Sequence, residues 1–195
     1  MTNNSSNNSE NVKQKLHLGC GTVIKKGWIN HDLAPLPGVD VVHDLRVFPW
    51  PFEDKQFDEV LMKDVLEHLP DTIRTFEEIY RITRPGAKIY ISVPYWNSVI
   101  AYGDPTHVKF FNEFSFDFFD PDKDACKERP YYSSARLHIR KLGLWVTPFE
   151  SVLKRKYTRD FLFFNPVLKK LILIFASFLN NIVSGLDLHF ERASE

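Results

Sequence analysis

A glycine pair and two aspartates stand where three short apolar runs of the chain end. Gly19-Cys20-Gly21 follows the first run, Asp32 ends the second and Asp44 follows the third. Glycines let a backbone approach a ligand closely, and a carboxylate at a strand end can accept hydrogen bonds from both hydroxyls of a ribose. The pattern therefore predicts an adenosine site, with Asp32 on the ribose and Asp44 on the adenine amino group. The alternative for both aspartates is a capping role in a loop.

Apolar neighbours complete the predicted cofactor-binding set. Leu33 and Leu45 directly follow the two aspartates, and Leu45 is expected to pack on the adenine ring. Cys20 is interpreted as a small packing residue inside the glycine loop. Cys20 and Cys126 lie far apart and in no metal-ligand spacing, so neither a metal site nor a disulfide framework is expected. A reducing cytoplasm fits this cysteine content best.

Three further residues are candidate catalytic groups. Asp64 directly follows a fourth apolar run and also belongs to the predicted cofactor-binding set, and its alternative role is to cap the turn at residues 65–69. The unperturbed pKa of an imidazole lies near neutrality, so His68 could act as a general base, whereas the alternative is a structural or cofactor-side role. His107 lies in the polar loop at residues 103–107, between aromatic runs, where the alternative is a solvated side chain. The catalytic prediction is therefore His107, His68 and Asp64.

Five short strands and one helix are expected to position these residues. The strands are predicted from short apolar runs, and a helix capped by Asp71 from apolar residues at helical spacing. Strands that alternate with helices and loops favour a mostly parallel α/β sheet. Only residues 22–27 separate the first two strands, which is too few for a crossover helix. The expected strands are 15–18, 28–33, 39–43, 57–62 and 88–93, and the expected helix is 71–84.

The sequence after residue 94 predicts smaller elements and one longer helix. A short helix is expected at 113–119, antiparallel strands at 135–140 and 143–147, and a helix at 167–183. The apolar stretch inside this last helix is too short to span a bilayer. Lysines and arginines beside it are typical of an interfacial helix, but packing against the domain or a second subunit is favoured. The predicted apolar side contains Leu168, Leu171, Ile172, Phe175, Phe178, Leu179 and Ile182.

Six segments match, in order, the motifs of one family. They are 16–21, 28–32, 57–60, 65–69, 81–88 and 91–94, and in them the chain resembles the class I S-adenosylmethionine-dependent methyltransferases. The resemblance implies a Rossmann-like, three-layer α/β sandwich whose sheet is mostly parallel with an antiparallel C-terminal strand. It also implies S-adenosylmethionine as cofactor, with Gly19 and Gly21 beside its methionine part. The usual third glycine and the first crossover helix are missing from this chain.

Composition and motif spacing disfavour several other classes of protein. Lys plus Arg and Asp plus Glu both number 25, so no net positive charge suggests a nucleic-acid partner. A dinucleotide fingerprint would need a glycine where Ile24 stands, which disfavours a nicotinamide-dependent oxidoreductase. Residues 1–11 lack the charged and apolar regions of a signal peptide. The expected organisation is a disordered tail at 1–12, a methyltransferase domain at 13–165 and an amphipathic helix with a tail at 166–195.

Taken together, the sequence predicts an enzyme that moves a methyl group from S-adenosylmethionine to an oxygen or nitrogen atom. The expected acceptor is a small molecule or a glycan-linked group, in the cytoplasm, with no nucleic-acid partner. The alternative from another class is a non-catalytic cofactor-binding or membrane-associated partner protein. In that case the C-terminal helix would make peripheral contact with the inner membrane face. The acceptor, the general base and the oligomeric state stay open.

Overall fold

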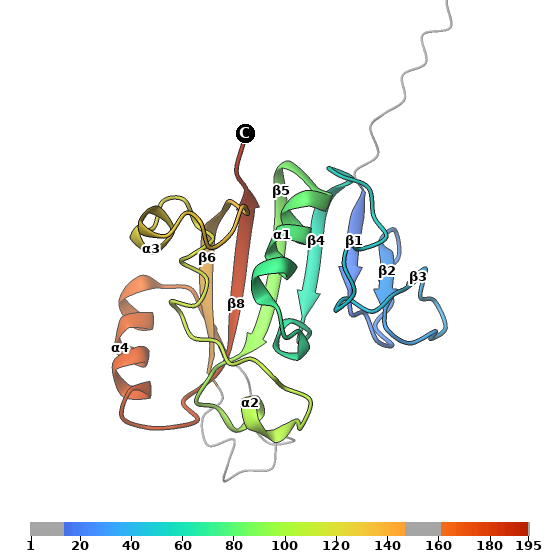
Figure 1. The fold of residues 1–195 in the computed structure, drawn as a ribbon. Helices are drawn as coiled ribbons and strands as arrows, with labels where there is room; N and C mark the ends of the chain where they lie inside the picture. Colours follow the sequence, from blue (N-terminus) through green and yellow to red (C-terminus); the bar gives the residue numbers. More distant parts are fainter. Residues whose placement is uncertain (1–13, 147–160, 195) are drawn as a thin grey trace, which may run out of the picture.

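The computed structural model describes residues 14–146 and 161–194, and one eight-stranded sheet forms its centre (Figure 1). The strand order across the sheet is β3-β2-β1-β4-β5-β8-β6-β7. The strands are β1 (Lys15–Leu18), β2 (Ile29–Asp32), β3 (Val41–Val42), β4 (Phe57–Lys63), β5 (Thr83–Pro94), β6 (Leu137–Val146), β7 (Phe161–Phe163) and β8 (Val183–Arg192). The helices are η1 (Leu66–His68), α1 (Thr72–Ile82), α2 (Val99–Gly103), α3 (Asp124–Glu128) and α4 (Pro166–Ala176).

The first five strands form the parallel half of the sheet, as expected. β1 pairs in parallel with both β2 and β4, β3 pairs with β2, and β5 pairs with β4. A loop without a helix joins β1 to β2, which confirms the short first crossover. Because parallel strands share one direction, the carboxyl ends of β1, β2, β4 and β5 lie along the same edge. The glycine loop and the residues that follow β4 therefore meet at that edge.

The other half of the sheet is antiparallel and is formed by later parts of the chain. β8 lies between β5 and β6 and runs antiparallel to both, and β7 is antiparallel to β6. This confirms a mixed sheet with an antiparallel C-terminal strand. The expected break at Leu142-Gly143 is wrong, because β6 is one strand that continues through these residues. The residues that form this strand differ from the expectation, because β8 spans Val183–Arg192, where the end of a helix and a tail are predicted.

Helix α1 occupies nearly the predicted range. The side chain of Asp71 accepts from the amide of Arg74 at 2.9 Å, as an N-cap does. The chain then enters β5 directly at Thr83, where it pairs with Phe57, so Pro85-Gly86 lies inside a strand and does not mark its start.

Two predicted helices differ from the structure. Residues 113–119 form turns, because the Asn112 side chain accepts from the amide of Phe114 and the hydroxyl of Ser115. Helix α4 ends at Ala176, and the backbone then turns through Asn181, whose φ is +63°, into β8. The apolar side expected for this helix is largely exposed, for example at Phe175. The residues that pack inward are Ile172, Leu173 and Ala176.

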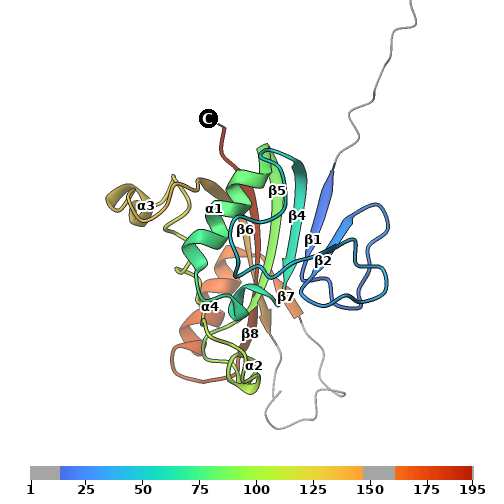
Figure 2. The same cartoon turned by 45° about the vertical axis from the view of Figure 1, so that its right-hand side comes forward.

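Helix α1 lies over one face of the sheet (Figure 2), and the hydrophobic core fills the space between them. Phe76 of α1 stacks on Phe119 with ring centroids 4.0 Å apart and contacts Phe190 of β8 edge-on. On the opposite face, alternate residues such as Tyr90 and His189 are half-buried and polar. Within the described ranges neither α1 nor α4 covers that face. The described residues therefore form two layers, the sheet and the helices on one of its faces, instead of the expected three. The crossover after β1 is too short to supply the missing helix.

The described part of the chain contains no helix long and apolar enough to cross a membrane. The N-terminal tail expected at 1–12 lies outside the described residues.

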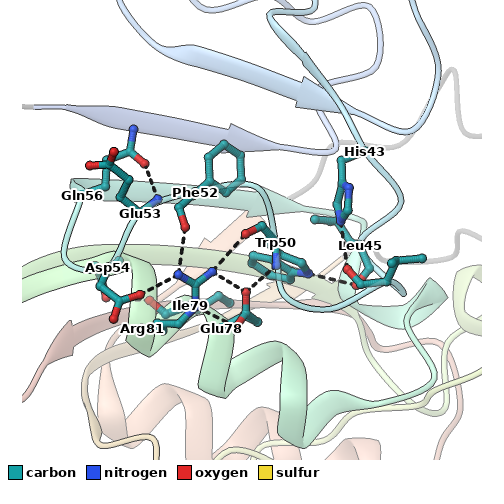
Figure 3. Close-up of polar contacts among 12 residues, drawn as sticks. His43, Leu45, Trp50, Phe52, Glu53, Asp54, Gln56, Glu78, Ile79 and Arg81 are labelled. Carbon is teal, nitrogen blue, oxygen red and sulfur yellow. Dashed lines mark hydrogen bonds and ion pairs between the residues drawn. The ribbon is translucent and has the colours of Figure 1, made fainter.

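Arg81 of α1 holds the long connection between β3 and β4 against the helix (Figure 3). Its guanidinium donates to both carboxylate oxygens of Glu78, at 2.8 and 2.7 Å, and to Asp54 at 2.7 Å. It also donates to the carbonyls of Trp50 and Phe52. Glu78 in turn accepts from the amide of Trp50 at 2.7 Å. These charge-assisted bonds satisfy backbone groups that no helix or strand pairs.

The Arg81 network predicts a large loss of stability when the guanidinium is removed. Arg81→Met leaves Glu78, whose side chain is 12% exposed, without its cation and frees two loop carbonyls. The free energy of unfolding in urea should fall by about 2–4 kcal/mol. Arg46→Met is the matched control, because the Arg46 side chain is 56% exposed, pairs with Asp44 and should change stability by less than about 1 kcal/mol. Equal effects of the two substitutions would contradict this role for Arg81.

Candidate active site

The glycine loop lies directly against the end of β4. Gly19 and Gly21 have φ values of +62° and +51°, a region that side chains rarely adopt. A Cβ added to Gly19 would overlap with Cγ2 of Val65, whereas one added to Gly21 would have no neighbour within 4 Å. Gly19 therefore allows close packing on β4, and Gly21 leaves open space beside the loop.

Asp32 lies beside this open space at the end of β2. Its Oδ2 accepts from the amide of Gly21 at 2.7 Å, and its Oδ1 accepts from the amide of Ala34 at 3.0 Å. A carboxylate oxygen has two acceptor sites, so each oxygen can still take a hydroxyl donor. Leu33 beside it is 60% exposed and offers an apolar surface. This arrangement fits the ribose of an adenosine cofactor.

Asp44 and Leu45 are placed differently from the expectation. The Asp44 carboxylate accepts from Nε and Nη2 of Arg46, and these hydrogen bonds lower its pKa below the usual range. Leu45 is 5% exposed and belongs to the hydrophobic core, while its carbonyl accepts from the indole of Trp50. An adenine ring would therefore have to compete with Arg46 for Asp44.

Cys20 is buried, in keeping with its interpretation as a packing residue. Its amide donates to the carbonyl of His31 at 2.9 Å and so joins the glycine loop to β2. Burial raises the pKa of the Cys20 thiol.

A cavity of about 650 Å³ lies at the carboxyl ends of β4 and β5. It brings together the three predicted catalytic residues Asp64, His68 and His107, although His107 lies far from the others in the sequence. Asp64 is the residue before Val65, which contacts the glycine loop, so β4 links the cofactor side to this cavity. The lining consists of Lys63, Asp64, Glu67, His68, Ser92, Val93, Pro94, Ile100, Gly103, Asp104, Pro105, His107, Trp145, Ser184 and Gly185.

Glu67 is the most unusual group in the cavity wall. Its side chain is 2% exposed, and neither carboxyl oxygen has a hydrogen-bond partner. Burial raises the pKa of Glu67 to about 8, and the neighbouring charges of Asp64 and Asp104 raise it further in the same direction. Its backbone carbonyl accepts from the amides of Val108 and Lys109, at 2.9 and 3.1 Å. Those bonds hold the loop that carries His107.

The two histidines of the cavity lie ring against ring. Their centroids are 4.7 Å apart in an edge-to-face arrangement. His107 Nδ1 lies 2.9 Å from the carbonyl of Ala101, and its Nε2 lies 3.9 Å from Oε1 of Glu67. His68 Nδ1 lies 2.9 Å from the hydroxyl of Thr106, and that hydroxyl donates to Asp104 at 2.6 Å. Each ring is thus oriented through its Nδ1 atom.

Several cavity residues were not expected from the sequence. Ser184 and Gly185 of β8 and Trp145 of β6 reach the site only because β8 lies next to β5 and β6 lies next to β8. Trp96 and Tyr102, which lie between β5 and the His107 loop in the sequence, line a separate, smaller cavity. Strand neighbours far apart in sequence leave no local signal, so only the assembled sheet shows them.

The parallel strands, the glycine loop and Asp32 define a protein of the class I methyltransferase type. Residues 25–91 match the family model for a methyltransferase domain. A methyltransferase from Archaeoglobus fulgidus that depends on S-adenosylmethionine has a TM-score of 0.58 at 19% identity, covering 93% of this chain and 87% of that one. A Thermotoga maritima protein described as a possible histamine N-methyltransferase has a TM-score of 0.57 at 14% identity, covering 92% and 82%.

A relative in Caenorhabditis elegans shares a short stretch of sequence. Phosphoethanolamine N-methyltransferase 2 is 43% identical over 42 residues, which are 22% of this chain and 10% of that protein. The match thus spans about a tenth of the relative's length. The family model therefore indicates a methyltransferase domain at residues 25–91, and the solved structures show that the chain has the fold of methyltransferases that depend on S-adenosylmethionine.

The contact between Gly19 and Val65 predicts unequal effects of adding a methyl group to the two glycines. Gly21→Ala should lower the free energy of unfolding by about 1–2 kcal/mol, the cost of the left-handed backbone alone. Gly19→Ala adds the overlap with Val65 and should cost about 1–3 kcal/mol more. Urea denaturation of both variants measures the difference. Adding Val65→Ala should recover part of the loss in Gly19→Ala only, and no recovery would contradict the packing argument.

Proposed function

We propose that this chain transfers a methyl group from S-adenosylmethionine to an oxygen or nitrogen atom of a small-molecule or glycan-linked acceptor. The observation that carries the proposal is the continuity at β4. Val65 contacts the glycine loop, and the adjacent Asp64 lines the cavity of about 650 Å³. A donor beside Gly19 and an acceptor in the cavity would meet at this strand end.

The cofactor side of the proposal rests on Gly19, Gly21, Asp32 and Leu33. Asp32 has free acceptor sites beside the open space at Gly21, which suits the ribose hydroxyls. The geometry supports Asp32 more than Asp44, because Arg46 already occupies the Asp44 carboxylate. When bound, S-adenosylmethionine supplies an activated methyl group, so the protein mainly needs to orient donor and acceptor.

The acceptor side of the proposal rests on Asp64, His68 and His107 in the cavity wall. A neutral imidazole can take a proton from an acceptor group near neutral pH. The name of the Caenorhabditis elegans relative describes transfer to nitrogen, and for this chain that supports keeping a nitrogen acceptor in the proposal.

A peripheral membrane or protein partner is the second candidate role, and one observation favours it. Val167, Phe175 and Phe178 of the α4 region are 70%, 60% and 83% exposed, and the exposed Lys170 lies near them in the sequence. Exposed aromatic side chains next to lysines are typical of helices that rest on anionic lipid surfaces.

Cofactor binding tests the proposed function directly. Asp32→Asn should weaken the binding of S-adenosylhomocysteine by about 10- to 100-fold, since hydrogen bonds to a charged group contribute about 1.5–3 kcal/mol. Isothermal titration calorimetry measures the change. Asp58→Asn is the matched control, because Asp58 pairs with Arg84 near the start of β4 and should leave the affinity unchanged. No binding of S-adenosylhomocysteine by the unaltered protein would refute the proposal.

Flotation with vesicles tests the membrane alternative. If α4 rests on lipid, the protein should float with vesicles that contain phosphatidylserine, and Phe175→Ser with Phe178→Ser should abolish this. Both side chains are exposed, so the double variant should keep its fold and its affinity for S-adenosylhomocysteine. Failure of the unaltered protein to float would rule out this role.

A further inference from the structure

We propose that Glu67, His68 and His107 bind a divalent first-row transition-metal ion in the wall of the cavity. One donor atom from each residue lies within 4.8 Å of the other two. Glu67 and His68 come from η1, and the loop after α2 brings His107 beside them. The three side chains line one cavity, so an ion held there would face the space in which an acceptor binds.

The hydrogen bonds leave Nε2 of each histidine with a free lone pair. A carbonyl only accepts, so His107 Nδ1 must carry the proton that bonds Ala101. The Thr106 hydroxyl gives its single proton to Asp104, so it must accept from His68 Nδ1. Histidines that bind metals commonly donate their other ring N–H to a carbonyl or a polar side chain in this way. Both rings are therefore prepared to act as ligands through Nε2. With an ion bound, these lone pairs could not also accept a proton, so Asp64 would be the remaining candidate base of the proposed function.

Glu67 lacks the partner that a buried carboxyl group normally has. Both of its oxygens are buried without a hydrogen bond, and a charged group in such a place is stable only when it is paired or binds a metal. Asp64 and Asp104 add negative charge nearby, which favours a cation over a neutral ligand. A bound divalent ion would give Glu67 its missing partner.

The ligand set and the spacing indicate the kind of ion. Two imidazoles and one carboxylate suit Zn²⁺, Mn²⁺, Fe²⁺ or Co²⁺ better than Mg²⁺ or Ca²⁺, which prefer oxygen ligands. Ligand atoms about 2.1 Å from a tetrahedrally coordinated ion lie about 3.4 Å apart. His107 Nε2 and Glu67 Oε1 are 3.9 Å apart, so about 0.5 Å of side-chain movement would bring these two atoms to that spacing.

A second group of potential ligands in the described residues provides the comparison. Asp120, Asp122 and His138 also lie within 4.8 Å, but their polar atoms already bond one another and the backbone. His138 donates to Asp122 at 2.8 Å, and Asp120 accepts from the amides of Asp122 and Ile139. This group is satisfied without an ion, so His138 serves as a control.

The ion would also narrow the class of acceptor, a point that rests on the proposed methyl transfer. Three protein ligands leave coordination positions open toward the cavity, and an oxygen atom of the acceptor can fill one of them, as water or substrate does at catalytic zinc sites. The acceptor would therefore be held through a hydroxyl, carboxylate or phosphate oxygen, whichever of its atoms receives the methyl group.

Titration with Co²⁺ tests the site in the full chain without any need for activity. The unaltered protein should bind one equivalent and show visible d–d absorption. His107→Gln and His68→Gln should each weaken binding by at least about tenfold, and His138→Gln should leave it unchanged. If His107→Gln fails to fold, His68→Gln still decides the question. Adding acetohydroxamate, a bidentate oxygen ligand, should change the absorption spectrum when open positions face the cavity.

Binding of S-adenosylhomocysteine to the same samples separates the two proposals. Retained cofactor binding without Co²⁺, Zn²⁺ or Mn²⁺ binding would overturn the metal site alone. Metal binding that His138→Gln abolishes and His107→Gln does not would overturn it as well. An absorption spectrum that acetohydroxamate leaves unchanged would overturn the oxygen-ligand inference. Metal binding without cofactor binding would support the site and count against the proposed function.

Discussion

The architecture depends on the buried ion pair between Arg81 and Glu78. The connection from β3 to β4 runs over the sheet without a helix of its own, so its backbone groups need partners from elsewhere. Arg81 donates hydrogen bonds to the carbonyls of Trp50 and Phe52, and Glu78 accepts one from the amide of Trp50 (Figure 3). One turn of α1 thus supplies hydrogen-bond partners for residues 50–54 of this connection. These bonds fix the path of the chain into β4.

That fixed geometry places the two functional regions on either side of one strand end. Val65, directly after β4, packs on Gly19 of the glycine loop, and Asp64 and Glu67 face the cavity. The loop that carries His107 is bound to the carbonyl of Glu67, so the acceptor side is assembled on the same short segment. A methyl donor and an acceptor need to be held within bonding reach, and a single rigid junction does this with few residues.

Burial of the Glu67 carboxyl group lowers the stability of the segment that connects the two functional regions. Its oxygens have no partner in the protein, which is costly in a buried place. Such a cost is often accepted at functional sites, where a ligand completes the bonding. The orientation of both neighbouring histidines through Nδ1 points to the same conclusion, because it leaves their other nitrogens available.

The sequence by itself determined the parallel half of the sheet and the helix capped by Asp71. Strands and caps of this kind depend on local apolar alternation and on one side chain near its own backbone. The family motifs between residues 16 and 94 likewise follow one another along the chain.

Only the tertiary structure decided the rest. The alternation of Leu186, Leu188 and Phe190 with polar residues is a local signal for a strand, but it does not reveal that β8 joins the middle of the sheet by pairing with β5 and β6. The exposed side of α4 could not be assigned from periodicity, because an apolar stripe does not reveal which residues a sheet will cover. The meeting of Glu67, His68 and His107 depends on hydrogen bonds between segments about 40 residues apart, and contacts at that separation exist only once the chain has folded.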